Sequence, residues 1–188
     1  RIERAISKKE KVLIYGDYDV DGTTAVSIMV LFFKKYISTI EYYIPCRYNE
    51  GYGISMTGID YAIKNDFSLI IALDCGISAV NQIDYANQNN IDVIICDHHK
   101  PPKKLPTAIA ILNPKQTKCY YPYKELSGCG VGFKLIQAYC INNEISFQEI
   151  VSYLDLVAVS IAADIVQLNG ENRVLAFYGL KQINSNPR

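Results

Sequence analysis

The sequence lacks several features that would place it at once in a common class. Its 19 basic residues balance 19 acidic ones, so no excess of positive charge indicates a general nucleic-acid binder. Its longest apolar stretch, residues 23–33, is too short to span a bilayer. The N-terminus carries no signal-peptide pattern. These absences predict a protein that is neither secreted nor embedded in a membrane, and that binds any polyanion locally.

The six cysteines show neither CxxC spacing nor the density of a disulfide scaffold. Cys75 and Cys96 lie in or beside apolar runs, so we interpret them as small buried residues and not as zinc ligands. A reducing cytoplasm is the compartment that fits this pattern best.

The chain begins at Arg1 without a methionine and ends in Asn-Pro-Arg, so we expect a fragment of a longer protein. Its 188 residues, 49% of them hydrophobic, suffice for one domain with a helical extension. We expect this domain to cover residues 1–188, with a sheet region over roughly residues 1–125 and a helical part over residues 126–188.

Short apolar runs alternate with helical patterns through the first two-thirds of the chain. The pattern predicts strands at residues 11–15, 42–46, 69–73, 92–96 and 108–112. It predicts helices at residues 23–36, 55–64 and 78–89, with Ser55 and Ser78 as N-caps. Further helices are expected at residues 131–142, 146–159 and 172–183, the last capped by Asn172. We therefore predict an α/β fold with a mainly parallel sheet, helices on both faces, and a helical C-terminal third.

Acidic and imidazole side chains follow three of the predicted strands. They are Asp17, Asp19 and Asp21 after the first strand, Asp74 after the third, and Asp97, His98 and His99 after the fourth. One such aspartate is usually a turn or cap residue, but parallel strands bring all of these groups to one edge. So many carboxylates repel one another unless a cation neutralises them. The mixture with imidazole favours Mn²⁺ or Mg²⁺ over structural zinc.

Two other interpretations of the first acidic loop fail. The loop matches the opening of an EF-hand, but position 12 of that motif is Glu and here it is Ile28, and a strand precedes the loop. Gly16 and Gly22 do not form the dinucleotide-binding pattern, and three carboxylates would repel a pyrophosphate.

Four segments resemble the motifs of the DHH phosphoesterases. They are Gly16-Asp-Tyr-Asp-Val-Asp-Gly22, Asp74-Cys-Gly76, Asp97-His-His99 and the Asp164 of Ala162-Ala-Asp-Ile-Val166. They occur in the order typical of that superfamily, and the resemblance extends over nearly the whole chain.

Within that superfamily the sequence is most similar to the RecJ-like exonucleases. Residues 50–54, 113–114, 126–135 and 153–157 also resemble RecJ segments. Relatives that cleave pyrophosphate, short oligonucleotides or cyclic dinucleotides usually carry His four residues before the first aspartate, where this chain has Leu13. The third aspartate, Asp21, is a RecJ-like feature.

The resemblance implies a role for each motif residue. Metal ligands would come from Asp17, Asp19, Asp21, Asp74, His98 and Asp164. Asp74 is expected to bridge two ions, and it stays open which two of the three aspartates in the first loop bind metal directly. The expected catalytic residues are His98, His99 and Asp97. Asp97 would orient His98, and His99 would contact a phosphate oxygen or protonate the leaving group.

Two further segments are candidates for substrate binding. Arg47 with Gly51, Tyr52 and Gly53 would approach a DNA phosphate, against the alternative of an ordinary turn. A second group, at the start of the helix near residue 131, would offer amide donors to a phosphate, against the alternative of a tight helix entry. This group is Ser127, Gly128 and Gly130.

The implied activity is that of a 5′→3′ exonuclease specific for single-stranded DNA, releasing 5′-mononucleotides with two Mn²⁺ or Mg²⁺ ions in DNA repair and recombination. Implied partners are single-stranded DNA, a single-strand-binding protein and a recombination helicase. We expect a cytoplasmic monomer. We also expect this chain to lack the DHH-associated and OB-like domains that follow such a core in RecJ. The alternatives are a DHH phosphodiesterase acting on oligoribonucleotides or cyclic dinucleotides, an inactive replication scaffold of DHH descent, and a phospho-receiver domain.

Overall fold

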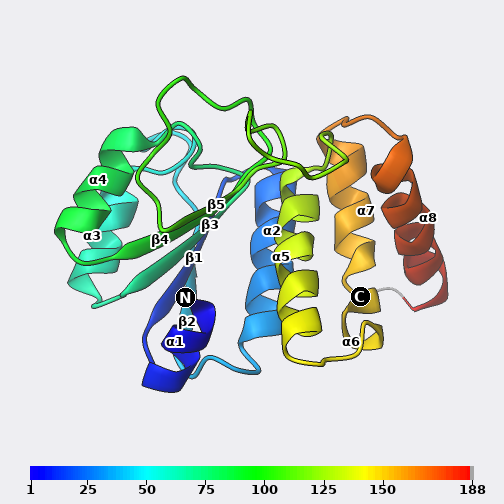
Figure 1. Ribbon diagram of the computed structural model, residues 1–188, viewed down its shortest axis with the longest axis horizontal. Helices are drawn as coiled ribbons and strands as arrows, with labels where there is room; N and C mark the ends of the chain where they lie inside the picture. The colour runs from blue at the N-terminus through cyan, green and yellow to red at the C-terminus, as the bar shows by residue number, and fades with distance from the viewer. Residues whose placement is uncertain (187–188) are drawn as a thin grey trace.

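The computed structural model describes residues 1–186, and within them the chain forms a five-stranded parallel sheet (Figure 1). The strand order is β2-β1-β3-β4-β5. The strands are β1 (Val12–Gly16), β2 (Ile40–Tyr43), β3 (Leu69–Leu73), β4 (Asp92–Cys96) and β5 (Ala110–Leu112). The predicted α/β fold with a mainly parallel sheet is confirmed.

Helices cover both faces of the sheet, and a second helical layer lies outside one of them (Figure 1). Helices α2 (Val20–Phe33) and α5 (Gly128–Asn142) lie on one face, and α3 (Met56–Lys64) and α4 (Val80–Gln88) lie on the other. The remaining helices are α1 (Ile2–Lys8), α6 (Gln148–Val151), α7 (Leu154–Ala163) and α8 (Gly170–Ser185). None of the helices within residues 1–186 is both long enough and apolar enough to cross a membrane.

The position of the central strands explains why their sequences are continuously apolar. Every residue of β1 and β3 is buried, because alternate side chains enter the cores on opposite faces. Ile14 packs in the core with α2 and α5, whereas Leu13 and Tyr15 pack in the core with α3 and α4. This sheet brings the ends of β1, β3 and β4 side by side.

Several predicted helix boundaries are wrong. The single helix expected at residues 146–159 is two helices, α6 and α7, because the chain turns between them and buries both Ile150 and Tyr153 in the core. Asn172 does not cap α8; Asn169 stands at that position, and the buried Asn172 donates to the carbonyls of Glu125 and Gln167 instead.

The third error concerns the start of α4. Its N-cap is Ala79, which makes no side-chain capping bond, so Ser78 does not cap the helix as expected. By contrast, the predicted cap at Ser55 is confirmed, since its side chain accepts a hydrogen bond from the Gly58 amide. Helix α2 begins earlier than predicted because Asp19 caps it.

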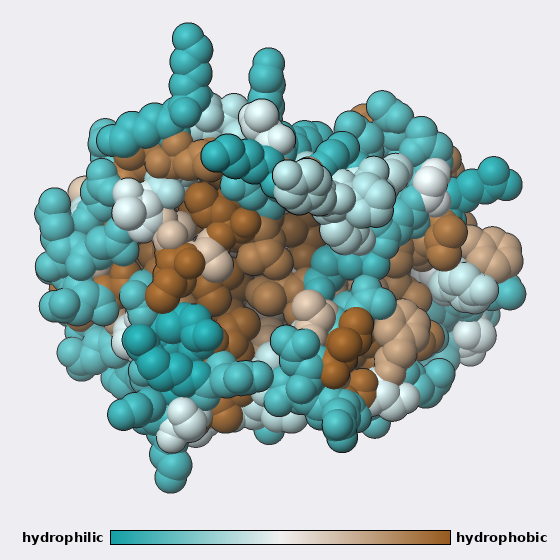
Figure 2. Space-filling model, viewed as in Figure 1, coloured by the Kyte–Doolittle hydropathy of each residue, from teal (hydrophilic) through white to brown (hydrophobic). Residues whose placement is uncertain are grey.

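An apolar hollow marks the face of the molecule seen in Figure 2. Its position agrees with a pocket of about 340 Å³ between the edge strand β5 and α5, with Ile111, Leu112 and Val131 in its lining. The hollow is separate from the acidic loops, which lie beyond the carboxyl ends of the strands.

Candidate metal centre

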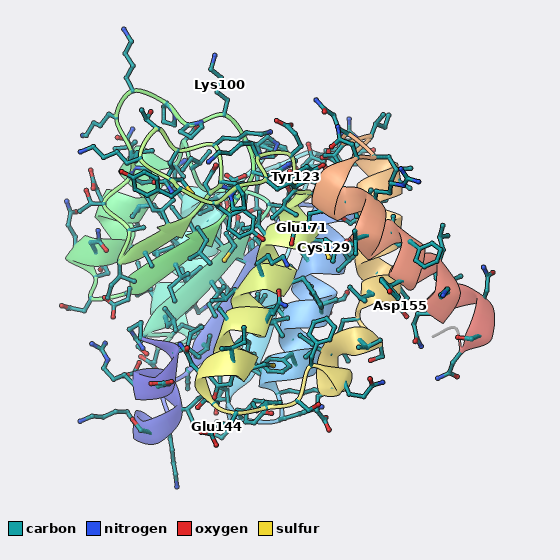
Figure 3. All side chains as sticks on the ribbon, turned by 45° about the vertical axis from the view of Figure 1, so that its right-hand side comes forward. Lys100, Tyr123, Cys129, Glu144, Asp155 and Glu171 are labelled. Carbon is teal, nitrogen blue, oxygen red and sulfur yellow. The ribbon has the colours of Figure 1, made fainter. Side chains whose placement is uncertain are left out.

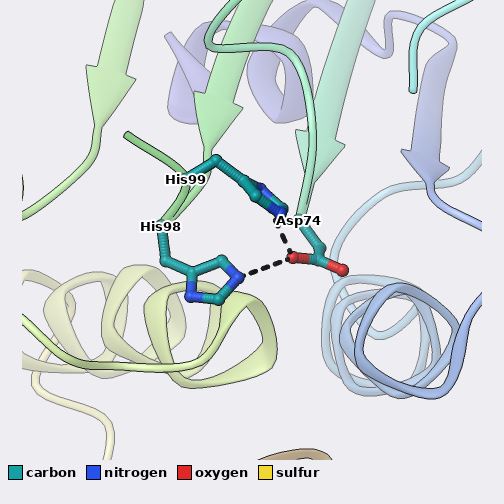
Figure 4. A group of neighbouring side chains, drawn as sticks. All are labelled: Asp74, His98 and His99. Atoms are coloured by element: carbon teal, nitrogen blue, oxygen red, sulfur yellow. Dashed lines mark ion pairs between the residues drawn. The ribbon is translucent and has the colours of Figure 1, made fainter. Parts of the chain in front are cut away.

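Three loops begin side by side at the ends of β1, β3 and β4, and His98 and His99 from one of them turn toward Asp74 in another (Figure 4). Asp74 directly follows β3 and has a φ of 58°, a left-handed conformation that aspartate adopts more readily than most residues. His98 and His99 follow β4, and both imidazoles are directed at the same oxygen of Asp74.

His98 lies at the centre of this arrangement. Its Nε2 is 3.2 Å from Oδ1 of Asp74, 3.5 Å from Oδ2 of Asp164 and 3.8 Å from Oδ2 of Asp21. Asp164 reaches this point from the C-terminal end of α7. Residues from three loops and a distant helix therefore place four possible ligand atoms around one small volume.

Buried polar atoms on the residues of these loops have no hydrogen-bond partner among the described residues. They are Oδ1 of Asp74, Oδ2 of Asp17 and both ring nitrogens of His98. An unpaired buried polar atom costs roughly 1–3 kcal/mol, so four of them on neighbouring loops need an explanation. Carboxylate oxygens and imidazole nitrogens are suitable ligands for Mn²⁺ and other divalent cations, so the residues present fit a metal site.

The amino-terminal end of α5 holds Asp21 in place. Its two carboxylate oxygens accept hydrogen bonds from the backbone amides of Gly128 and Cys129, both at 2.7 Å. The Ser160 hydroxyl donates to the same carboxylate at 2.7 Å and lies 2.6 Å from the Ser127 hydroxyl. Figure 3 shows Cys129 at the end of α5 that faces the loops, with Glu144 beyond its opposite end. The helix dipole favours a carboxylate at this position.

Replacing Ser160 with alanine should destabilise the protein by about 1.5–3 kcal/mol, because the buried Asp21 carboxylate loses a charge-assisted hydrogen bond. Chemical denaturation measures this change. Ser185→Ala is the matched control, since the exposed Ser185 bonds only to a carbonyl in its own turn. Equal stability of the two variants would contradict the role assigned to Ser160.

The other two aspartates of the first loop differ from Asp21 in their free oxygens. Oδ1 of Asp17 accepts a hydrogen bond from the Tyr18 amide, and its Oδ2 has no partner in the described structure. Oδ1 of Asp19 caps α2 by accepting from the Gly22 amide at 2.8 Å. Gly22 is required there, because a Cβ atom would lie 2.5 Å from the carbonyl oxygen of Asp17.

Asp97 orients His99 and not His98, contrary to the sequence-based expectation. Its Oδ1 lies 2.7 Å from Nδ1 of His99 and also accepts hydrogen bonds from the backbone amides of His98 and His99. Its Oδ2 accepts a bond from the Ile77 amide. The His99 hydrogen bond helps to lower the pKa of Asp97 against the effect of burial, and the same bond raises the pKa of His99.

The loop before α3 brings Tyr52 to the metal centre. The Tyr52 hydroxyl is 2.9 Å from Nε2 of His99, and its ring makes an edge contact with Tyr18. The Arg47 guanidinium lies 5.5 Å from the centre of the Tyr18 ring. Gly51 and Gly53 have φ values of 80° and 81°, which explains glycine on either side of Tyr52.

The predicted phosphate donors at the start of α5 have other partners. The Gly128 amide donates to Asp21, and the Gly130 amide donates to Oγ of Ser127, which caps the helix. All three residues are buried. In the structure these residues support Asp21 and cap α5, and their binding of a phosphate stays a prediction.

A protein-family model matches most of this chain. The family model described as "DHH family, N-terminal domain" matches residues 11–161, which contain all three acidic loops and the helix that supports Asp21. The chain belongs to the DHH family. Asp164 lies just beyond the matched residues and completes the DHH-domain centre in the structure.

Several individual relatives are described as RecJ exonucleases. The single-stranded-DNA-specific exonuclease RecJ of Bacillus subtilis is 44% identical over 183 residues, which are 97% of this DHH chain and 22% of the relative. A crystal structure of exonuclease RecJ bound to manganese matches with a TM-score of 0.88 and 31% identity, over 98% of this chain and 46% of that one. The Thermus thermophilus RecJ structure in complex with Mn²⁺ has a TM-score of 0.83 and 28% identity, over 98% and 26%. The DHH chain thus spans less than half the length of each.

Burial and mutual repulsion raise the pKa values of three carboxylates of the DHH centre, those of Asp17, Asp74 and Asp164, in the absence of a cation. Burial, and then the charges of Asp21 and Asp19, raise the pKa of Asp74 to about 10. Burial also raises the pKa values of Asp17 and Asp164, the latter partly offset by His98. A cation at this point would remove the repulsion and restore the charged forms.

The metal-free DHH chain should lose stability as pH rises. Asp74 has an ordinary pKa of 3.8 and a folded-state pKa of about 10, so between these values the folded state keeps a proton that the unfolded state releases. Unfolding then becomes easier with pH, by at most about 1.4 kcal/mol per unit. Denaturation in EDTA at pH 6 and pH 8.5 measures this effect, and Asp74→Asn should reduce the slope. Equal slopes in both proteins would contradict the assigned pKa.

Sequence reasoning missed two residues of the DHH centre. Ser160 lies one helical turn before Asp164 on α7, and this spacing on one helix face was the available signal. Asn113 follows β5, is buried, and donates from its side chain to the His99 carbonyl at 2.9 Å. It fixes the backbone of the Asp-His-His loop, although the sequence suggested only a RecJ-like segment there.

Proposed function

We propose that this chain is the catalytic core of a metal-dependent exonuclease of RecJ type. The reaction is hydrolysis of single-stranded DNA from the 5′ end, releasing 5′-mononucleotides in DNA repair and recombination. The observation that carries the proposal is the set of unpartnered buried atoms on Asp17, Asp74 and His98, in a chain that resembles single-stranded-DNA-specific exonucleases over nearly its whole length. The natural cofactor is Mn²⁺ or Mg²⁺, with two ions in the complete site.

The aspartate oxygens that lack hydrogen-bond partners indicate which residues would bind metal directly. Asp17 and Asp19 from the first loop would bind metal directly, with Asp74 between the two ions. His98 and Asp164 would complete the shell of one ion. Asp21 would support the metal site without binding an ion directly, since its oxygens already accept three hydrogen bonds.

Bound divalent cations supply an acidified water and stabilise charge on the reacting phosphate. The protein's own residues do the remaining work. His99 is half-exposed beside Asp74, so its ring would be positioned to contact a phosphate oxygen or a leaving group. Asp97 keeps the His99 ring in this orientation. Arg47 and Tyr18 offer a cation and a ring face beside the same opening for the DNA strand.

Three observations disfavour the alternatives. Leu13, at the position where small-substrate DHH enzymes carry a ligand histidine, is fully buried among apolar side chains and offers no donor. A degenerate scaffold would lack some of the ligands, whereas Asp21, Asp74, His98 and Asp164 come together here. A phospho-receiver would need neither histidine, yet His98 lies at the centre of the site.

The cellular setting follows from the same proposal. We expect a cytoplasmic monomer that works with a single-strand-binding protein and a recombination helicase. The six cysteines, all unpaired in the described structure, suit a reducing compartment. The DNA-binding domains expected after this core would supply most of the affinity for the strand.

The test is an assay of the protein in its natural full length with single-stranded DNA labelled at one end. Mn²⁺-dependent release of mononucleotides from a 5′-phosphorylated strand is the expected result, with a dinucleotide turned over more slowly and duplex DNA resistant. Preferred hydrolysis of the dinucleotide would favour the small-substrate alternative. No hydrolysis of either substrate would refute the proposed activity.

A further inference from the structure

A cavity of about 340 Å³ opens next to the metal centre, between His99 and the loop that joins β3 to α4. Its volume is at the lower end of the range for small-molecule sites. His99 belongs to both places, because its Nδ1 lies 4.0 Å from the Asp74 carboxylate while its ring also lines the cavity. The ligand assignment above leaves this cavity without a role.

The walls of the cavity suit a flat, weakly polar group. Ile54 and Ile77 are buried and supply aliphatic surface. His99 and Tyr52 supply two rings, whose centres are 5.8 Å apart in an edge arrangement. Rings of this kind are the surfaces on which nucleobases stack in single-stranded nucleic-acid sites.

Two polar side chains at the start of α4 line the same cavity and have no other partner in the described structure. Ser78 was expected to cap α4, but the N-cap is Ala79, so the Ser78 hydroxyl is free. The half-buried Gln82 makes no side-chain hydrogen bond within residues 1–186. Its amide is both a donor and an acceptor, and can therefore pair with the edge of any base.

The charges around the cavity exclude a phosphate as its occupant. No lysine or arginine is among its lining residues, and its only formal charges come from Asp97 and, when protonated, His99. A phosphate would lie beside the Asp97 carboxylate without a fixed cation of its own. A neutral heterocycle carries no such penalty.

We propose that this cavity binds the nucleobase of the nucleotide whose 5′ phosphate lies at the metal centre, with the Gln82 amide on the base edge. This inference rests on the proposed nuclease function, because that function puts a nucleotide phosphate at Asp74. Gln82 would accept all four bases, which suits an enzyme that degrades a strand regardless of sequence.

Calorimetric binding of 5′-dAMP and of 2-deoxyribose 5-phosphate to the full-length protein with Mn²⁺ tests the cavity. The two ligands differ only in the base, and stacking on protein rings corresponds to roughly a tenfold difference in affinity. The wild-type protein should bind dAMP about tenfold more tightly. Gln82→Ala should reduce the ratio about threefold, and Gln82→Phe, which fills the cavity, should bring it close to one.

Gln88→Ala is the matched control, since Gln88 is an exposed glutamine at the other end of α4. It should keep the wild-type ratio. Equal affinity of wild-type protein for the two ligands, or an unchanged ratio in both Gln82 variants, would overturn the proposal. Binding needs no turnover, so the two proposals can fail separately. If the protein binds dAMP about tenfold more tightly than 2-deoxyribose 5-phosphate but does not hydrolyse DNA, the exonuclease function is refuted and the base site is supported.

Discussion

Asp74→Asn should abolish Mn²⁺-dependent hydrolysis, with a loss in turnover of roughly a thousandfold or more. Asp74 is the one carboxylate that both histidines of the Asp-His-His loop approach, and its Oδ1 has no hydrogen-bond partner among the described residues. Asparagine keeps the size of the side chain but removes the charge that would hold two cations. Metal-ion catalysis contributes several kcal/mol to such reactions, and each 1.4 kcal/mol is a factor of ten. Release of mononucleotides at saturating Mn²⁺ measures the loss.

A matched control for this variant exists just before the same strand. Asp66 is an exposed aspartate with a φ of 57°, close to the 58° of Asp74, and it is remote from the ligand set. Asp66→Asn should leave hydrolysis unchanged. Asp74→Asn should still fold, because the neutral side chain resembles the protonated form that the raised pKa favours in the absence of metal. Activity retained in folded Asp74→Asn would contradict the central role of Asp74.

Gly128→Ala should reduce hydrolysis by roughly a hundredfold although it alters no polar group. A Cβ atom on Gly128 would lie 2.4 Å from Oδ1 of Asp74 and 2.5 Å from its Cβ, so the carboxylate must move. A displacement of about 1 Å at a reacting centre is enough for a loss of this size. Steady-state turnover and Mn²⁺ affinity are the measurements, and both should worsen.

Gly132→Ala, one turn further along α5, separates this effect from a general effect of alanine in the helix. The added Cβ would meet only the ends of two flexible side chains, those of Leu73 and Met29, at 3.3 and 3.6 Å. This variant should retain most of the activity. If the two variants lose activity equally, the contact between α5 and Asp74 is not the cause.

The sequence was most informative where one physical rule dominates. Continuous burial of β1 and β3 required long apolar runs, and those runs predicted the sheet and the edge at which the acidic loops meet. The aspartate and histidine motifs then predicted which side chains converge. The structure places Asp74, His98 and Asp164 together as that pattern implied.

The sequence could not predict the hydrogen-bond partners within the site, because each side chain had several possible partners. Asp97 was expected to hold His98, but the tight turn after β4 puts its Oδ1 against three donors from its own loop, including the His99 ring. Asp21 was one of three candidate ligands in the first loop, and only the distant α5 and α7 show that both of its oxygens accept hydrogen bonds. Local pattern cannot place an amide more than 100 residues away.

The most direct test of the metal centre is an anomalous difference map from crystals of the protein soaked in MnCl₂. The structure predicts one or two peaks about 2.1 Å from Oδ1 of Asp74, with His98 Nε2 and Asp164 around one of them. Weaker density or loss of the peaks is expected in Asp74→Asn crystals. A map with no peak among these side chains at saturating Mn²⁺ would contradict the assignment of this site as a catalytic metal centre.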